Sequence, residues 1–129
     1  MLNPSTADAD IDDPTIRRCM SFARREGAGG IIVVNLYALR ATDPRMLKQA
    51  PFPFGPANFD ALQNVVIEAD TAPIVCAWGA DQMANDAAKS FMEIAEREDA
   101  YLVCLGKTKA GHPRHPLYVR GDQPFEPFQ

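Results

Sequence analysis

The feature that most constrains the fold of this sequence is a threefold alternation of helix-like segments with short apolar runs. The runs cover residues 31–36, 73–79 and 101–106 and are rich in Val, Ile and other apolar residues. Each follows a segment whose apolar residues recur at helical spacing. Strands that are apolar on both faces and alternate with helices are typical of parallel sheets covered by helices. We therefore expect an α/β fold, a three-layer α/β/α domain with a mainly parallel sheet.

The helix-like segments have recognisable limits. Asp13-Pro14 supplies an N-cap followed by proline, and an amphipathic helix is predicted from there to Gly27. Two further helices are predicted over residues 58–69 and 81–98, and a short one over residues 45–49. A chain of 129 residues has the length of one domain, so we expect a single unit over its whole length.

The apolar runs and the cysteines indicate the cellular compartment of the protein. No run is long enough to span a bilayer, and the first residues lack the basic segment and apolar stretch of a secretion signal. This predicts a cytoplasmic protein with no membrane partner. Cys19, Cys76 and Cys104 are odd in number and lie in apolar patterns, which favours buried free thiols over disulfides or a metal site. No metal or other cofactor is expected.

Polar residues stand at the ends of the predicted strands. Ligands of parallel sheets bind beyond the carboxyl ends of the strands, so Asn35, Trp78-Gly79 and residues 107–118 are expected to converge on one edge. Asn3 would join them only at the end of another strand, yet it stands two residues after Met1. We therefore expect the first strand of the sheet to be missing from this chain.

A missing strand has a physical consequence, because it leaves unpaired backbone groups in its neighbours. Three alternatives would resolve this: a true start upstream of Met1, a different pairing within the fold, or a partner chain that makes the protein a homodimer. We favour the upstream start.

Two polar clusters held by prolines lie near the two ends of the chain, Leu2-Asn3-Pro4-Ser5 and Gly111-His112-Pro113-Arg114-His115-Pro116-Leu117-Tyr118. With these motifs the chain resembles a bacterial and phage family of unknown function whose members share the Leu-Asn-Pro-Ser-Thr-Ala-Asp opening. That likeness runs from Met1 to about Tyr118. On fewer residues the chain also resembles the uracil-DNA glycosylase superfamily, which implies a uracil-DNA glycosylase-like fold.

The resemblance to the glycosylases implies a role for each motif. Asn3-Pro4-Ser5 is similar to the Asn-Pro-Gly loop that positions the attacking water, with Ser5 in place of the glycine. Asn35 is similar to the asparagine that reads the edge of the flipped base, and Trp78-Gly79 matches a pair that follows a later strand. His115-Pro116 is similar to the His-Pro loop that contacts the base carbonyl and the DNA backbone, although Leu117 stands where that loop has serine.

The polar candidates also have ordinary structural alternatives. The amide oxygen of Asn3 can hold a water, but a neutral amide is a weak general base. Asn35 can present donors and an acceptor to an extruded base, or it can cap the sheet edge by bonding nearby backbone. His115 can donate to a developing oxyanion, or it can be a loop histidine bonded to the backbone.

The remaining candidates surround these three. Tyr37 and Trp78 can stack on a base, and they are equally suited to the core at strand ends. His112 and Arg114 belong to the same loop as His115, and we expect them to contact the substrate.

The charge pattern limits the partners. A net charge of -4 gives no overall attraction to nucleic acid. A local basic rim is nevertheless expected from loop residues that should share one face: Arg40, Lys107, Lys109, His112 and Arg114. An acidic cluster near the N-terminus lacks the glycine and the final glutamate of a calcium loop, so we expect a solvated loop with the last aspartate as a helix cap: Asp8, Asp10, Asp12 and Asp13.

Together these features predict a domain that binds a nucleobase, possibly modified, in single-stranded or flipped-base DNA. If it is an enzyme, we expect it to hydrolyse the N-glycosidic bond. The catalytic residues would be Asn3 and His115, and the substrate-binding residues Pro4, Ser5, Asn35, Tyr37, Trp78, Gly79, His112 and Arg114. The alternatives are a non-catalytic module for nucleotides or nucleic acids, and a hydrolase or transferase acting on free nucleosides or nucleotides.

Overall fold

The computed structural model describes Met1, residues 13–37 and residues 58–129. Its elements are α1 (Pro14–Arg25), α3 (Asn58–Ala69), β1 (Ile74–Cys76), η1 (Gln82–Ala84), α4 (Asn85–Arg97), β2 (Leu102–Cys104), η2 (Pro116–Tyr118) and β3 (Glu126–Pro127). The three long helices predicted from the sequence are confirmed, with a 3-10 turn opening the last of them. The strands predicted over residues 73–79 and 101–106 are confirmed in shorter form. The short helix predicted over residues 45–49 lies outside the described residues.

Helix α1 begins as its sequence predicts. The Asp13 carboxylate accepts hydrogen bonds from the N–H groups of Thr15 (2.8 Å) and Ile16 (3.4 Å), which satisfies two donors that the first turn leaves unpaired. Pro14 occupies the first helical position, where no N–H is needed. The helix buries Phe22 and carries its arginines on the remaining surface. Asp13 is therefore a helix cap, as expected.

The sheet is small and mixed. β1 and β2 are parallel, with Ile74 opposite Leu102 and Cys76 opposite Cys104. β3 lies antiparallel on the other side of β2, giving the order β1-β2-β3. The expected α/β character holds as a mixture of helix and strand, whereas β3 was not predicted. Glu126-Pro127 has no strand-like pattern, and the burial of Phe128 beyond it shows that packing holds this segment against β2.

The run at residues 31–36 was predicted to be a buried strand and is not one. It forms no β-ladder with the described part of the chain, and Ile31, Ile32 and Val33 are 37%, 78% and 37% exposed. A strand requires a neighbour that satisfies its backbone groups. The described part of the chain supplies only Met1, whose amino group donates to the Val34 carbonyl (3.3 Å) and whose carbonyl accepts from the Leu36 N–H (2.9 Å).

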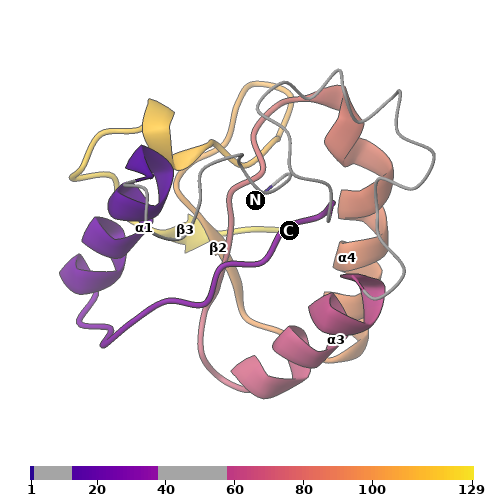
Figure 1. Ribbon diagram of the computed structural model, residues 1–129. Helices are drawn as coiled ribbons and strands as arrows, with labels where there is room; N and C mark the ends of the chain where they lie inside the picture. Colours follow the sequence, from indigo (N-terminus) through magenta and orange to yellow (C-terminus); the bar gives the residue numbers. More distant parts are fainter. Residues whose placement is uncertain (2–12, 38–57) are drawn as a thin grey trace.

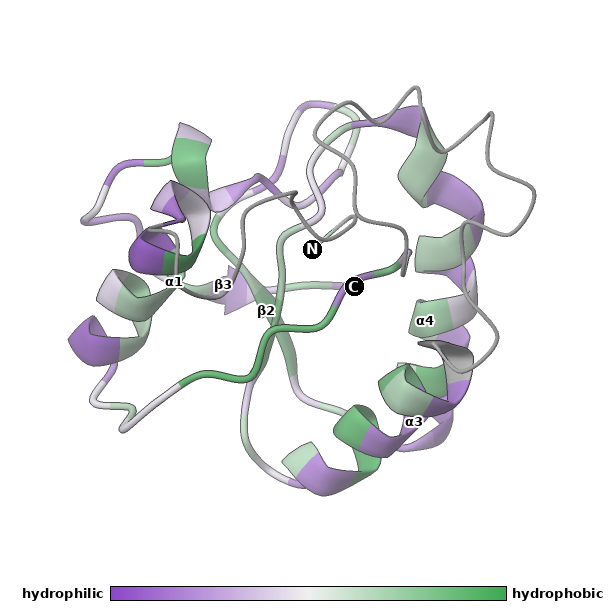
Figure 2. Ribbon diagram, viewed as in Figure 1, coloured by the Kyte–Doolittle hydropathy of each residue, from purple (hydrophilic) through white to green (hydrophobic). Residues whose placement is uncertain are grey.

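The helices lie on both sides of the strands. In Figure 1, α1 is on one side, and α3 and α4 are together on the other. The larger core cluster joins the α3 and α4 side to β1 and β2, with Trp78 in edge contact with Phe91 (6.0 Å) and Phe128 (5.5 Å). A smaller cluster joins Phe22 of α1 to Leu105 and Val119. Figure 2 shows the matching polarity, with purple, hydrophilic residues recurring along the outer faces of the helices.

The three cysteines are free thiols, as expected. Cys76 and Cys104 are buried as predicted, whereas Cys19 is only half-buried. Burial raises the pKa of the Cys76 thiol to about 12, so it is inert at neutral pH. Across residues 13–37 and 58–129, no helix has the length and apolarity required to cross a bilayer.

Candidate functional site

The candidate site includes the segment that follows β2, residues 106–118, which we name the His-Pro loop. Its two arms are joined by backbone hydrogen bonds from the Thr108 N–H to the His112 carbonyl (2.9 Å) and from the Arg114 N–H to the Gly106 carbonyl (3.0 Å). Gly106 and Gly111 both have φ of +88°, a conformation that side chains disfavour. The shape of the loop is therefore set by its own backbone.

Two prolines anchor this loop in the protein. Pro113 and Pro116 are both fully buried, whereas Arg114 between them is exposed and His115 is half-buried. The Pro113 carbonyl also accepts a hydrogen bond from the Gly79 N–H (2.9 Å). This bond ties the loop to the turn that follows β1, so two motifs predicted to converge are brought together.

Gly79 and His115 are direct neighbours. A Cβ atom placed on Gly79 would lie 3.7 Å from the Cβ of His115, an ordinary contact distance. The φ of Gly79 is +82°, so the turn itself requires glycine. The Trp78-Gly79 pair is thus a turn that passes beside the histidine.

His115 is held in one tautomer. Its Nδ1 accepts a hydrogen bond from the Leu117 N–H (3.2 Å) and caps η2. Burial lowers the pKa of the imidazole, and the positive charge of the Met1 amino group lowers it further. The ring is therefore neutral at pH 7, and because Nδ1 is the acceptor, Nε2 carries the proton. The side chain presents a neutral N–H donor.

The start of the chain reaches the same place. Met1 is paired with residues 34–36 and is close enough to His115 for its charge to act on the imidazole. Burial lowers the pKa of the Met1 amino group as well. Asn35 is half-buried between the two residues that bond Met1. Asn3, Pro4 and Ser5 follow directly in the sequence but lie outside the described residues.

The two aromatic candidates occupy core positions. Tyr37 is 3% exposed and its hydroxyl donates to the Met83 carbonyl. Trp78 is 6% exposed and contacts two phenylalanine rings edge to face. Both rings therefore serve packing, which was one of the two alternatives for them.

His112 faces a different space from His115. An open cleft of about 380 Å³ lies between the His-Pro loop and α4, and its lining includes His112, Trp78, Asn85, Lys89 and Phe128. His115 is not part of that lining. In the Trp78-Gly79 turn, Trp78 lines the cleft with His112, whereas Gly79 contacts His115. The site residues that were expected in one pocket therefore lie in two groups.

Two arginines of α1 hold the segment after His115 in place. Arg18 donates through Nε to the Pro116 carbonyl (3.3 Å) and through Nη2 to the Val119 carbonyl. Arg25 donates through Nη1 to the carbonyls of Gly121 (3.2 Å) and Gln123. This role of the two arginines was not predicted from the sequence. Their separation of seven residues, which puts them on one helix face, was the only signal of a shared role.

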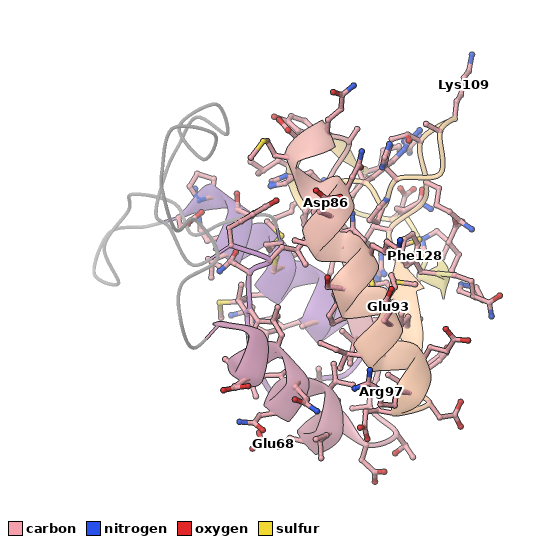
Figure 3. The ribbon with its side chains drawn as sticks, turned by 90° about the vertical axis from the view of Figure 1, so that its right-hand side faces the viewer. Glu68, Asp86, Glu93, Arg97, Lys109 and Phe128 are labelled. Carbon is pink, nitrogen blue, oxygen red and sulfur yellow. The ribbon has the colours of Figure 1, made fainter. Side chains whose placement is uncertain are left out.

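The charged surface is divided between the loop and α4. Lys109 projects from the His-Pro loop in Figure 3, and Lys107 and Arg114 are also exposed there. Asp86 and Glu93 stand on the exposed face of α4 in the same view. Of the expected basic rim, these three cations are exposed on the loop, His112 lines the cleft instead, and Arg40 lies outside the described residues.

The described residues include no group of His, Cys, Asp and Glu side chains that would hold a metal ion. Of the acidic cluster near the N-terminus, Asp8, Asp10 and Asp12 lie outside the described ranges. Asp13 is engaged with the first turn of α1.

Comparison with known proteins gives a family. No curated protein and no solved structure matches the chain. A family model described as "Protein of unknown function (DUF1643)" matches residues 1–117, which takes in the N-terminal motif, both strand-end motifs and the His-Pro loop up to Leu117. The chain therefore belongs to the DUF1643 family of proteins of unknown function.

Proposed function

We propose that the protein binds a nucleobase at the edge where Met1, Asn35, Gly79 and His115 meet, and that it hydrolyses the N-glycosidic bond of that base. The proposal includes a three-layer uracil-DNA glycosylase-like fold. The observation that carries it is the state of His115, a neutral imidazole whose Nδ1 accepts the Leu117 N–H. Its remaining N–H is a donor that needs no proton transfer to act.

Such a donor suits the chemistry of glycosidic cleavage. The bond between the sugar C1′ and the base nitrogen breaks, and its electron pair leaves with the base. A water oxygen bonds to C1′, and the proton that this water loses passes through solvent to the departing base. Negative charge develops on the base carbonyl oxygen, where a preorganised neutral N–H lowers the barrier. His115 takes this role because its ring is fixed by η2 and by the buried Pro116.

The other residues supply position. Asn3 holds the attacking water through its amide oxygen, and Asn35 reads the edge of the base from the end of the 31–36 segment. The exposed Lys107, Lys109 and Arg114 contact the DNA phosphates on either side of the extruded nucleotide. The substrate is therefore a base in single-stranded DNA or one flipped from a duplex.

The test is base excision from oligonucleotides that carry uracil, hydroxymethyluracil or other altered bases, scored as alkali-labile abasic sites. We expect excision by the wild-type protein and a loss of about 100-fold or more in His115→Ala, because one preorganised donor is worth about that factor. His112→Ala is the matched control, since His112 lines the separate cleft. Absence of abasic sites, or equal excision by an Asn3→Ala variant, would contradict the proposal.

The distribution of charge favours a second candidate function. The net charge of -4 and the exposed acidic residues of α4 oppose generic DNA binding, which favours hydrolysis of a free nucleoside or nucleotide at the same site. Salt dependence separates the two. DNA binding through three loop cations should weaken steeply with added salt, whereas binding of a neutral nucleoside should not.

A further inference from the structure

The cleft between α4 and the His-Pro loop has no part in the proposed base excision. Its volume of about 380 Å³ falls within the range of small-molecule sites. Residues 111–113 of the loop form one wall, and Phe128 appears beside α4 in Figure 3. The other wall is a single face of α4, because its residues are spaced three and four apart: Asn85, Ala88, Lys89 and Met92.

The lining of this cleft is graded from apolar to polar. Its buried members are apolar, namely Trp78, Pro113 and Phe128. Its polar members on α4, Asn85 and Lys89, are exposed at the rim. Ligand sites have this arrangement, in which apolar surface supplies contact area and a few polar groups fix the orientation. Aromatic rings and prolines offer flat apolar surfaces, on which a planar ring packs well.

The polar groups of the cleft favour an anion. Lys89 and His112 are its ionisable side chains, and no Asp or Glu is among the described residues that line it. In the described structure, neither the Lys89 ammonium nor the His112 ring forms an ion pair or a hydrogen bond. Asp86 and Glu93 lie one turn before and after Lys89 on α4, but they are exposed and outside the lining. Both groups are therefore available to a ligand.

We propose that the cleft is a second binding site, which takes a small planar aromatic molecule with one anionic group, a phosphate or a carboxylate. The ring lies against Trp78, Met92 and Phe128. The anionic group stays at the rim, where it accepts hydrogen bonds from the Lys89 ammonium and the His112 ring. This site is separate from the space beside His115, so the inference does not depend on the proposed function.

The test uses reporters that the chain already contains. Trp78 is its one tryptophan, and His112 and His115 are its two histidines. We expect AMP or cinnamate, at millimolar concentration, to change the fluorescence of Trp78 and to shift the ring-proton NMR signals of His112. The two probes carry phosphate and carboxylate, so the tighter one identifies the anionic group. Adenosine, which lacks the phosphate, and inorganic phosphate, which lacks the ring, should bind about fivefold or more weakly than AMP.

A pair of neutral variants on α4 tests the contact at the rim. Lys89→Gln should weaken the binding of the tighter probe by about three- to fivefold, because a partly solvated charge contributes about that factor. Arg97→Gln is the matched control, since Arg97 is an exposed cation two turns further along the same helix and outside the cleft. It should leave the affinity unchanged. Both positions are exposed, so both variants should keep the Tm of the wild-type protein.

Four outcomes would overturn the proposal. Trp78 and His112 could fail to respond to both probes, or Lys89→Gln could bind as tightly as Arg97→Gln. Adenosine or inorganic phosphate could bind as tightly as AMP, which would remove the need for one half of the ligand. A response at His115 alone would mean that the probe occupies the proposed base site. Base excision is scored separately, so its loss leaves this result unaffected.

Discussion

The His-Pro loop and the 31–37 segment were both expected to hold site residues at strand ends. They differ in how firmly their contacts hold them in place. The loop is fixed by backbone bonds between its arms, two buried prolines and the bond from Arg18 of α1 to the Pro116 carbonyl. The 31–37 segment has a buried end at Leu36 and Tyr37 and an exposed beginning at Ile31 to Val33. A loop can satisfy part of its backbone within itself and be fixed by single long-range bonds, whereas a strand depends on a separate strand for its whole row of backbone hydrogen bonds.

The largest expected effect tests the two ends of the 31–37 segment. Leu36 is 4% exposed, so Leu36→Ala should lower the free energy of unfolding by about 2–5 kcal/mol through lost burial and the cavity left behind. Ile32→Ala, at a side chain 78% exposed, should cost about 0.5 kcal/mol or less. Urea denaturation measures both. Equal losses of unfolding free energy would mean that Leu36 and Ile32 do not differ in burial.

The next effect tests the support of the His-Pro loop. Arg18→Ala removes two charge-assisted hydrogen bonds to the Pro116 and Val119 carbonyls and should cost about 1.5–3 kcal/mol. Arg24→Ala is the matched control, because Arg24 is exposed on the same helix and makes no side-chain contact of this kind in the described structure. The losses are again read from urea denaturation. If Arg24→Ala is as costly as Arg18→Ala, the loop is not held by Arg18.

A smaller effect separates backbone strain from site geometry. Gly79→Ala and Gly111→Ala both place a side chain at positive φ, and each should cost about 1 kcal/mol. Only the Gly79 methyl group would contact His115, at 3.7 Å, whereas nothing lies within 4 Å of one at Gly111. Calorimetry should therefore show similar losses of stability. Excision or base binding should fall only in Gly79→Ala, and an equal fall in Gly111→Ala would argue against a site beside Gly79.

The smallest effect is a pH dependence that arises from His115. Its pKa is lowered by burial, so between that value and the unfolded value of 6.5 the native state binds fewer protons than the unfolded state. Stability is therefore complete above pH 6.5 and falls as the pH decreases through the lowered pKa. His115→Gln should flatten this part of the profile in urea titrations. An unchanged profile would show that another group is responsible.

The Met1 amino group adds to the same trend at higher pH. Its pKa is lowered from 8.0, so its contribution begins to fall below pH 8.0 and is distinguished from that of His115 by acetylation of the N-terminus.

Much of the fold was predictable from local patterns. The helices over residues 14–25, 58–69 and 85–97 follow from apolar spacing and, for the first, from the Asp13-Pro14 cap. The strands β1 and β2 follow from short apolar runs between those helices. β3 was missed because Glu126-Pro127 is held by pairing with β2 and by the burial of Phe128, neither of which has a local pattern.

The candidate site was predictable only in part. The meeting of Gly79 with His115 followed from the rule that strand ends share an edge. The separation of His112 from His115 could not be predicted. The two histidines are three residues apart in a proline-bound loop, and the directions of their side chains are set only when the loop packs against the rest of the protein. The role of Arg18 was hidden for a similar reason, since its partners are backbone carbonyls about one hundred residues away.

The amino-acid pattern alone determined the helices, the central strands and the two proline-bound motifs, because spacing, caps and proline geometry act over a few residues. The tertiary structure decided which histidine stands beside Gly79, which arginines hold the loop, and that the apolar run at residues 31–36 does not form a strand beside Met1 alone. Hydrogen-bond ladders and side-chain burial join segments far apart in the chain, and a run of β-branched residues becomes a strand only where another strand meets it.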